Sequence, residues 1–159
     1  MWTADALKAW YGIDTQPALA ADAGTTAASL TWLLTGDAGQ RAIVAQAMAW
    51  PPAQAASGTA WMAPFLAQLL DDPYDAVRLG AARSLRLLPG FAAIDVDVTA
   101  APSTRRQAQL QVMTTWDRVR PRPAIAAPEL LMNDAGDVDI PRVLALLKTR
   151  NTRPMLLRE

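Results

Sequence analysis

The chain contains no cysteine and no histidine among its 159 residues. Without cysteine it can form no disulfide, no zinc–thiolate site and no thioether attachment of haem. Without histidine it lacks the commonest general base, the commonest metal ligand and the central member of a Ser-His-Asp triad. The most frequent routes to catalysis are therefore closed, and we expect a protein with no enzymatic activity, no cofactor and no bound metal.

An excess of charge of one sign is also missing, because 15 Lys and Arg balance 15 Asp and Glu. A neutral chain disfavours an overall binder of nucleic acid or anionic membrane, although a local basic patch stays open. No run of about 18 apolar residues occurs, so we expect no membrane span. Residues 1–8 lack the basic and apolar regions of a signal peptide. A complete chain is therefore expected in the cytoplasm, and the alternative is a domain of a longer exported protein.

Apolar residues make up 52% of the sequence and aromatic residues only 6%, because alanine supplies much of the apolar fraction. Alanine favours helix and lets neighbouring helices approach closely. The length suffices for one domain with a real core. The composition therefore predicts a single all-α domain over residues 1–159.

Two amphipathic helices joined by a short turn occur twice along the chain. The clearer copy covers residues 57–90 and the weaker copy covers residues 26–50. Arg41 and Arg78 occupy equivalent places in the two copies, 37 residues apart. A helix pair repeated at this spacing predicts a short α-solenoid, a fold that usually serves as a binding surface. A chance similarity between two amphipathic hairpins is the alternative.

The remaining segments are predicted to flank the two hairpins and to cap their ends, because the terminal faces of a solenoid would otherwise expose apolar surface. They are an N-terminal cap at 3–25, a further helix at 103–119, and a C-terminal extension at 120–159 with its last helix at 141–149. Residues 93–98 alternate between apolar and polar, which predicts an extended segment packed along the hairpins. Pro51 and Pro52 are expected to stop the second helix of the first hairpin.

Capping residues predict where the helices begin. The expected N-caps are Asp37, Asp75, Ser103 and Asp139. Helical spacing predicts that Leu110 and Leu144 face the core from the last two helices.

The segment from Leu69 to Leu88 resembles a HEAT repeat. Its pattern consists of turn aspartates, then Val77 and Arg78, small residues at Ala81 and Ala82, and Leu85. A similar pattern in the first hairpin consists of Asp37, Arg41, Ala45 and Met48. HEAT proteins pair turn aspartates with such arginines of a neighbouring repeat. The resemblance therefore implies a structural ladder made of Asp37, Asp72, Asp75, Arg41 and Arg78.

A narrower resemblance connects the chain with the HEAT-type region at the C-terminal end of bacterial multihaem cytochrome c and TPR-containing proteins. The residues that carry it are 36–41, 71–78, 83–86, 147–151 and Glu159. Haem attachment in such proteins needs Cys-x-x-Cys-His motifs, which this chain lacks, so it could only be the accessory, non-haem part. A piece of such an exported protein is expected in the periplasm.

These observations predict a non-catalytic module for protein–protein interaction or scaffolding, with an accessory domain of a larger redox assembly as one form of it. The partner is expected to be another protein or another domain of a longer chain. The surface formed by the second helices is expected to bind, with exposed tryptophans as anchors. The residues expected there are Arg41, Gln46, Arg78, Arg83 and Arg86, together with Trp50 and Trp61.

A local basic concentration supports a different class, a nucleic-acid-binding protein similar to the HEAT-like alkylpurine DNA glycosylases. Its residues are Arg105, Arg106, Arg118, Arg120 and Arg122. Such a run is more typical of a solvated helix face and linker, and the second helices lack a comparable density of Lys and Arg. A third alternative is a purely structural domain that packs against another part of a longer chain through an exposed apolar face.

Two acidic segments could hold a cation. Asp71, Asp72 and Asp75 lie close together in the sequence. Residues 133–139 are rich in Asp and Asn, as calcium-binding loops are. The first cluster follows the spacing of a capped HEAT turn, and the second fails the spacing of an EF-hand. We therefore predict turns and helix caps at both places.

Overall fold

The computed structural model describes residues 9, 26–121 and 127–153, and the regular structure of these residues is helical. The helices are α3 (Ala28–Thr35), α4 (Ala38–Ala47), α5 (Pro51–Ser57), α6 (Met62–Leu69), α7 (Asp75–Arg86), α8 (Pro102–Val119) and α9 (Ile140–Lys148), with a 3-10 turn η1 at Pro128–Leu130. The described residues contain no strand, only two isolated bridges at Met132. The prediction of an all-α fold is confirmed. The predicted N-terminal cap at 3–25 lies outside the described residues, apart from residue 9.

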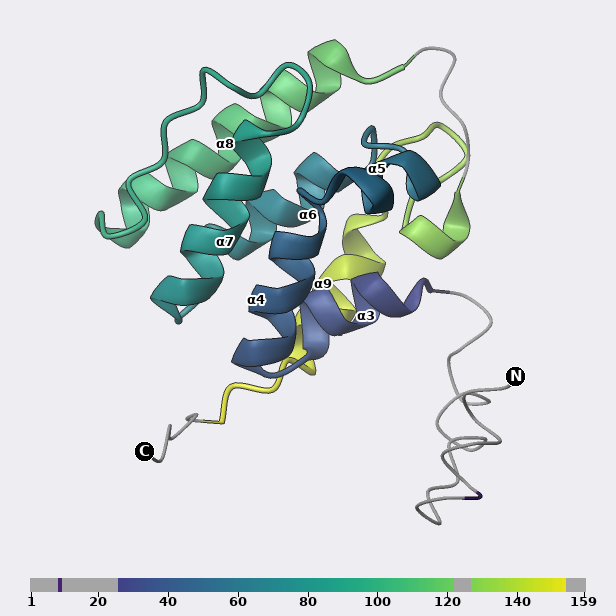
Figure 1. Ribbon diagram of the computed structural model, residues 1–159, viewed down its shortest axis with the longest axis horizontal. Coiled ribbons are helices and arrows are strands. Elements are labelled where there is room, and N and C mark those ends of the chain that lie inside the picture. The colour runs from purple at the N-terminus through teal and green to yellow at the C-terminus, as the bar shows by residue number, and fades with distance from the viewer. Residues whose placement is uncertain (1–8, 10–25, 122–126, 154–159) are drawn as a thin grey trace.

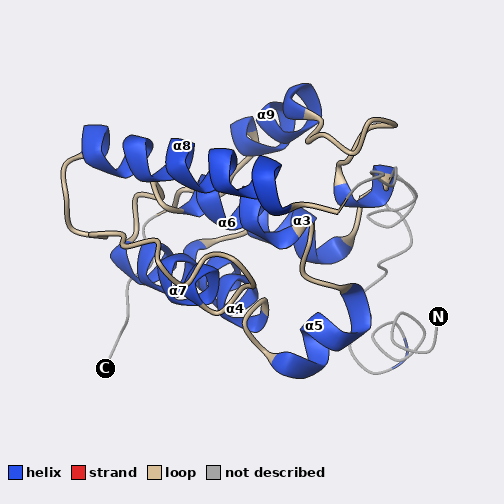
Figure 2. Cartoon of the chain, turned by 90° about the horizontal axis from the view of Figure 1, so that it is seen from above, coloured by secondary structure: helices blue, strands red, loops and turns tan. Residues whose placement is uncertain are grey.

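The helices form three layers (Figures 1 and 2). Helices α3 and α6 make the middle layer, which Figure 2 shows between α4 and α7 on one side and α8 and α9 on the other. Along the chain, α3 packs on α4 and α6 packs on α7, so each pair forms a helical hairpin. The third layer is made by contacts of α8 with α6 and of α9 with α3.

Helices α4 and α7 lie side by side and run in the same direction. A Cβ added to Gly80 would meet the carbonyl oxygen of Ala42 at 3.6 Å, an ordinary contact distance. One turn further along, Ser84 Oγ donates a hydrogen bond of 2.7 Å to the carbonyl oxygen of Ala45. Residue numbers therefore rise together along the two helices, and an alanine at position 80 would fit between them without a clash.

The middle layer explains why a third layer exists. Seven of the eight residues of α6 are buried, so this helix is apolar around its whole circumference. Such a helix needs cover on every side. Helix α8 supplies that cover with Val112, Thr115 and Trp116, all buried. The flanking helices were predicted to cap the ends of the hairpins, whereas α8 and α9 pack on the hairpins' first helices.

The prolines after α4 have a second role that the sequence analysis did not anticipate. Helix α4 ends at Ala47, before Pro51, as expected. The same prolines then occupy the first positions of α5, where a missing N–H costs nothing. The segment at residues 93–98 has no regular structure, and it buries Ile94 while leaving Asp95 exposed.

Two predicted N-caps are confirmed and two are wrong. Asp37 and Asp139 each accept a backbone hydrogen bond in the first turn of α4 and α9. The N-caps of α7 and α8 are instead Tyr74 and Ala101, one and two residues before Asp75 and Ser103. The backbone turns into the helix slightly earlier than the polar side chain suggests.

The inward orientation predicted for Leu110 and Leu144 is also wrong, because their exposed fractions are 68% and 51%. Leu110 precedes the buried Val112 by two residues, which places it on the opposite side of the helix. None of the described helices combines the length and the apolar character that crossing a membrane requires.

Candidate interaction surface

The outer face of α4 and α7 lies on the side of the layer that points away from the middle helices (Figure 2). Helical spacing turns Arg41 and Ala45 of α4 into the protein and Ile43 outward. The exposed fractions of Ile43, Trp50 and Leu87 are 71%, 61% and 65%. Large apolar side chains are therefore exposed on α4, directly after α7 and directly before α5.

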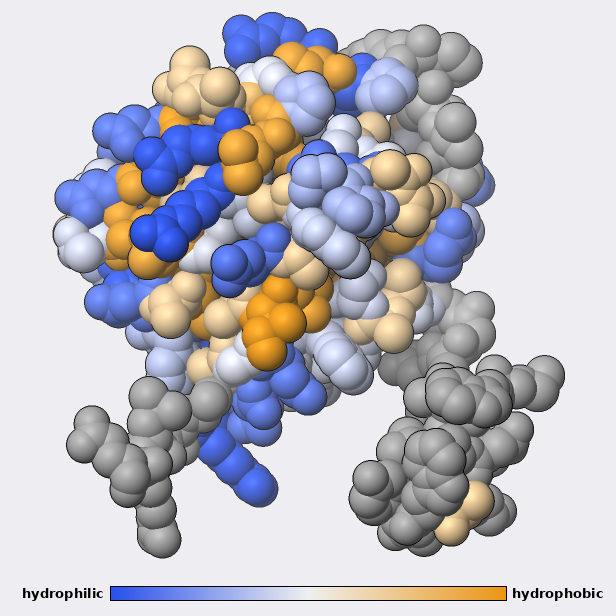
Figure 3. Space-filling model, viewed as in Figure 1, coloured by the Kyte–Doolittle hydropathy of each residue, from blue (hydrophilic) through white to orange (hydrophobic). Residues whose placement is uncertain are grey.

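The apolar residues on the α4 side surround an open hollow of about 510 Å³. It is lined by Ile43, Gln46, Ala47, Ala49, Trp50 and Pro51. Figure 3 looks at the molecule from this side, and apolar and hydrophilic groups lie next to one another over α4 and α7. The hollow continues from the end of α4 into the start of α5, and no charged residue lines it.

The charge on this face comes from α7. Arg83 and Arg86 are exposed, and neither takes part in any ion pair found among the described residues. Helices α4 and α5 contain no acidic residue and only one basic residue, Arg41, which is buried. The acidic residue of α7 is Asp75, which is paired with Arg78 at the start of the helix. The surface therefore combines apolar side chains with two unpaired positive charges.

Arg41 was predicted on this surface, and its burial contradicts that role. Its side chain is fully buried, and its Nε and Nη2 atoms donate to the two carboxylate oxygens of Asp72 at 2.8 and 3.0 Å. Its Nη1 donates to the carbonyl oxygens of Gly36 and Asn151. Four of the five guanidinium N–H groups are thus committed to acceptors within the protein, and the side chain is fully buried, so it is not accessible to a partner.

Asp72 is the centre of this buried network. Besides those from Arg41, the Asp72 carboxylate accepts hydrogen bonds from Arg150 Nη1 at 3.3 Å and from the backbone N–H of Tyr74 at 3.0 Å. Burial lowers the pKa of the Arg150 guanidinium, and the negative charge of Asp72 opposes that shift. One carboxylate therefore connects the first hairpin, the second hairpin and the residues after α9.

Arg78, the equivalent residue of the second hairpin, is also buried and equally unavailable to a partner. It donates from Nε to the carbonyl oxygen of Val98 at 2.7 Å and from Nη1 to that of Asp72 at 2.6 Å. Its carboxylate partner is Asp75, three residues earlier in the same helix. Asp37, the third predicted acidic member of the ladder, makes the capping box of α4 with Gln40.

The prediction that Trp50 and Trp61 are exposed is correct for Trp50 and wrong for Trp61. Trp50 is exposed and lines the hollow, but Trp61 is 8% exposed and belongs to the core. The Trp61 indole packs against Phe65 with ring centroids 6.1 Å apart. Its neighbour Pro64 lies within a helix that is buried on all sides, so the proline is no sign of surface position.

Sequence reasoning did not select Ile43 and Leu87. The signal was present, because Ile43 follows Arg41 by two residues on a helix whose buried face includes Arg41 and Ala45. An isoleucine on the outer side of an amphipathic helix is out of pattern. The inward residues alone define the amphipathic pattern of α4, and Ile43 lies outside that pattern.

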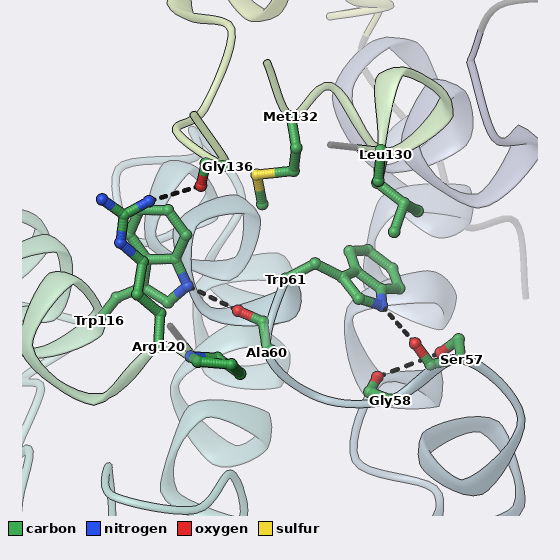
Figure 4. Close-up of a pocket in the computed structure, with 11 residues that line it drawn as sticks. Ser57, Gly58, Ala60, Trp61, Trp116, Arg120, Leu130, Met132 and Gly136 are labelled. Atoms are coloured by element: carbon green, nitrogen blue, oxygen red, sulfur yellow. Dashed lines mark hydrogen bonds between the residues drawn. The ribbon is translucent and has the colours of Figure 1, made fainter. Parts of the chain in front are cut away.

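A second hollow, of about 310 Å³, lies between the start of α6, the end of α8 and residues 127–136 (Figure 4). Its labelled apolar walls are Trp61, Trp116, Leu130 and Met132. The indole nitrogens of the two tryptophans donate to backbone carbonyls, at 3.1 Å to Ser57 and 2.6 Å to Ala60. These donors are thus already satisfied, and the hollow was not anticipated from the sequence.

Arg120 closes one side of this second hollow. Its guanidinium lies over the Trp116 ring, 4.8 Å from the centroid, and donates to the carbonyl oxygen of Gly136. It also forms ion pairs with Asp117 and Asp137, at 3.0 and 2.6 Å. The side chain ties the end of α8 to the following loop and is not available to a ligand phosphate.

The other arginines of the predicted basic segment are either paired with a carboxylate, exposed, or outside the described residues. Arg105 pairs with Asp71 at 2.7 Å, and Arg106 approaches the same carboxylate at 3.7 Å. Arg118 is exposed, and Arg122 lies outside the described residues. The positive charges are thus largely neutralised by carboxylates, and they form no continuous basic surface among the described residues.

The acidic segments likewise serve the fold. The described residues contain no group of three or more acidic side chains placed to hold a metal ion. Asp71, Asp72 and Asp75 each face a different arginine. In the turn at residues 133–137, Asn133 Oδ1 accepts hydrogen bonds from the backbone N–H groups of Ala135 and Asp137. The Asn133 side chain thus stabilises the turn from within.

Comparison of the chain with models of protein families, with curated proteins and with solved structures found no match.

Proposed function

We propose that this chain is a non-catalytic protein-interaction module, built as a short α-solenoid of HEAT-like hairpins, that binds its partner across the outer face of α4 and α7. The parallel packing of these second helices supports the solenoid arrangement, as does the ion pair from Arg41 of one hairpin to Asp72 of the next. The resemblance to multihaem cytochrome regions would make such a module an accessory part of a larger redox assembly.

The observation that carries this proposal is the exposure of Ile43 and Trp50, which line one hollow, together with that of Leu87 at the end of the neighbouring helix α7. Large apolar side chains gathered on a surface are a usual mark of an interaction site. Tryptophan in particular is enriched among the residues that dominate binding energy. Beside them, Arg83 and Arg86 add charged groups that can form hydrogen bonds at the rim of an interface.

The test is a comparison of surface variants of the tagged protein in a nuclease-treated lysate. Ile43→Asp with Leu87→Asp places two charges on the proposed surface, and both side chains are exposed, so the fold should be retained. The control is Leu110→Asp, an exposed apolar residue of α8 in the third layer. We expect the same proteins to be recovered with the original chain and the control, and to be lost with the double variant.

The outcome that contradicts the proposal is equal recovery of every protein by all three chains. Circular dichroism of each variant verifies that the helices are intact. Recovery of nucleic acid in the absence of nuclease, lost at high salt, would instead favour the glycosylase-like class. The ion pairs of Arg105 and Arg120 give that alternative no support.

A further inference from the structure

We propose that the partner segment is an acidic amphipathic helix that lies along the seam between α4 and α7, with its apolar stripe on Ile43, Trp50 and Leu87 and its carboxylates on Arg83 and Arg86. This inference rests on the proposed function and adds to it the chemistry of the partner.

The shape of the seam fits a helix. On α7, the residues Ala76, Gly80, Arg83 and Leu87 recur at intervals of four, three and four, so they form one stripe along the helix. The first half of this stripe is small, because Ala76 and Gly80 have little or no side chain. Ile43 of α4 and Trp50, which precedes α5, line the open hollow on the other side of the seam. Small residues on α7 beside these large apolar side chains leave room for a third helix to pack against the two parallel helices.

The positive charges of Arg83 and Arg86 favour a negatively charged partner segment. Arg83 and Arg86 are exposed and have no ion-pair partner among the described residues. Covering them with a neutral apolar segment would desolvate two guanidinium groups without compensation. A segment with Asp or Glu beside its apolar stripe would instead give each guanidinium a charge-assisted hydrogen bond and would be steered to the site.

A nucleic acid fits the same surface poorly. Phosphate-dominated binding needs many cations along the backbone path. The seam offers two, placed at one end of α7, while Ile43, Trp50 and Leu87 are apolar. A carboxylate-bearing peptide therefore fits this surface better than a nucleic acid does.

The probe is a displayed library of random 16-residue peptides. It is selected on the full chain and counter-selected on the uncharged double variant Ile43→Ser with Leu87→Ser, so that peptides requiring this surface remain without a bias from added charge. We expect the enriched peptides to carry apolar residues at helical spacing together with an excess of Asp and Glu. Enrichment of neutral or basic peptides would overturn the inference about charge while leaving the interaction surface in place. If no peptide is enriched, the proposal of an acidic amphipathic helix as partner is contradicted as well.

A charge exchange then tests the two arginines directly. In the variant Arg83→Glu with Arg86→Glu, we expect the affinity for an enriched peptide to fall by about tenfold, since two solvent-exposed ion pairs are replaced by repulsion. Exchanging the acidic residues of that peptide for lysine should restore binding to the variant and weaken binding to the original chain. Arg118→Glu, an exposed residue of α8, is the matched control.

The two proposals fail in different ways. Loss of binding with the aspartate variants but not with the glutamate variants supports a surface that binds without regard to charge, which contradicts the acidic partner alone. If the peptides enriched before counter-selection bind every variant equally, both proposals are contradicted. Affinity is measured by fluorescence anisotropy of labelled peptide at low and high salt, where added salt should weaken the original pair.

Discussion

Arg41 and Arg78 stand at equivalent places in the two hairpins, yet their guanidinium groups have different partners. Arg41 of the first hairpin makes a bidentate ion pair with Asp72, which belongs to the turn of the second hairpin. Arg78 of the second hairpin binds Asp75 of its own helix and the carbonyl oxygen of Val98. The first arginine therefore joins two hairpins, and the second joins its own hairpin to the segment that follows.

The difference follows from what lies next to each arginine. Arg41 has a further hairpin beside it, and that hairpin's turn supplies a carboxylate. Arg78 has no such neighbour among the described residues, and the irregular segment at residues 91–101 supplies the Val98 carbonyl oxygen in its place. Equivalent positions of the two hairpins thus carry the same residue type, while the partners of each arginine depend on the segment that packs beside it.

Asp72→Ala should have the largest effect on stability. The substitution leaves the guanidinium of Arg41 buried without its carboxylate, with Arg150 close by. Breaking a buried pair from one side costs about 3–5 kcal/mol, because the remaining charge stays uncompensated. Urea denaturation followed by circular dichroism measures the free energy of unfolding, and loss of folding at room temperature would agree with a cost of this size.

The control is Asp71→Ala, one residue earlier in the same turn. Asp71 pairs with Arg105 at a site where the carboxylate side chain is 27% exposed. A partly exposed pair of this kind is worth about 1 kcal/mol or less. Equal losses for the two variants would contradict the distinction between the ion pair that joins the hairpins and its neighbour.

A double-mutant cycle makes the comparison of the two arginines quantitative. Arg41→Met and Arg78→Met are each combined with Asp72→Asn. Arg41 contacts the carboxylate of Asp72, so we expect a coupling energy of about 2 kcal/mol, within the range for residues in direct contact.

Arg78 contacts only the backbone carbonyl of Asp72, so its cycle should show a coupling near zero. Arg78→Met alone should still lower stability, by about 1–3 kcal/mol, through unsatisfied buried acceptors. A coupling of similar size in both cycles would mean that the two arginines act alike, and that the difference in their partners has no energetic consequence.

The helices were predictable from the sequence because their signals are local. Apolar residues at helical spacing, the capping Asp37 and the prolines predict α3, α4, α6 and α7 to within a few residues. The role of Asp72 was predicted only through its resemblance to a repeat, since no spacing rule connects residues 31 positions apart. The third layer was missed because it depends on α6 being buried on both sides, a property of packing that no single helix reveals.

The candidate surface was predicted at the level of helices and not of residues. Long basic side chains were expected to face solvent, and Arg83 and Arg86 do so. Arg41 faces the core instead, because helix geometry places it with Ala45 on the buried side, where Asp72 compensates its charge. Charge alone thus misplaces a residue whose partner lies far away in the sequence.

The smallest effect concerns the starts of α4 and α7, where the two hairpins differ again. Asp37 caps α4 with a reciprocal pair of hydrogen bonds to Gln40, of 2.8 and 3.0 Å, whereas α7 begins at Tyr74 with no side-chain cap. Asp37→Ala should therefore cost about 1 kcal/mol. Asp75→Ala removes an ion pair whose carboxylate is 77% exposed, and should cost about 0.5 kcal/mol or less. Urea denaturation of both variants measures the difference, and a larger loss for Asp75→Ala would show that its pairing with Arg78 matters more than the cap of α4.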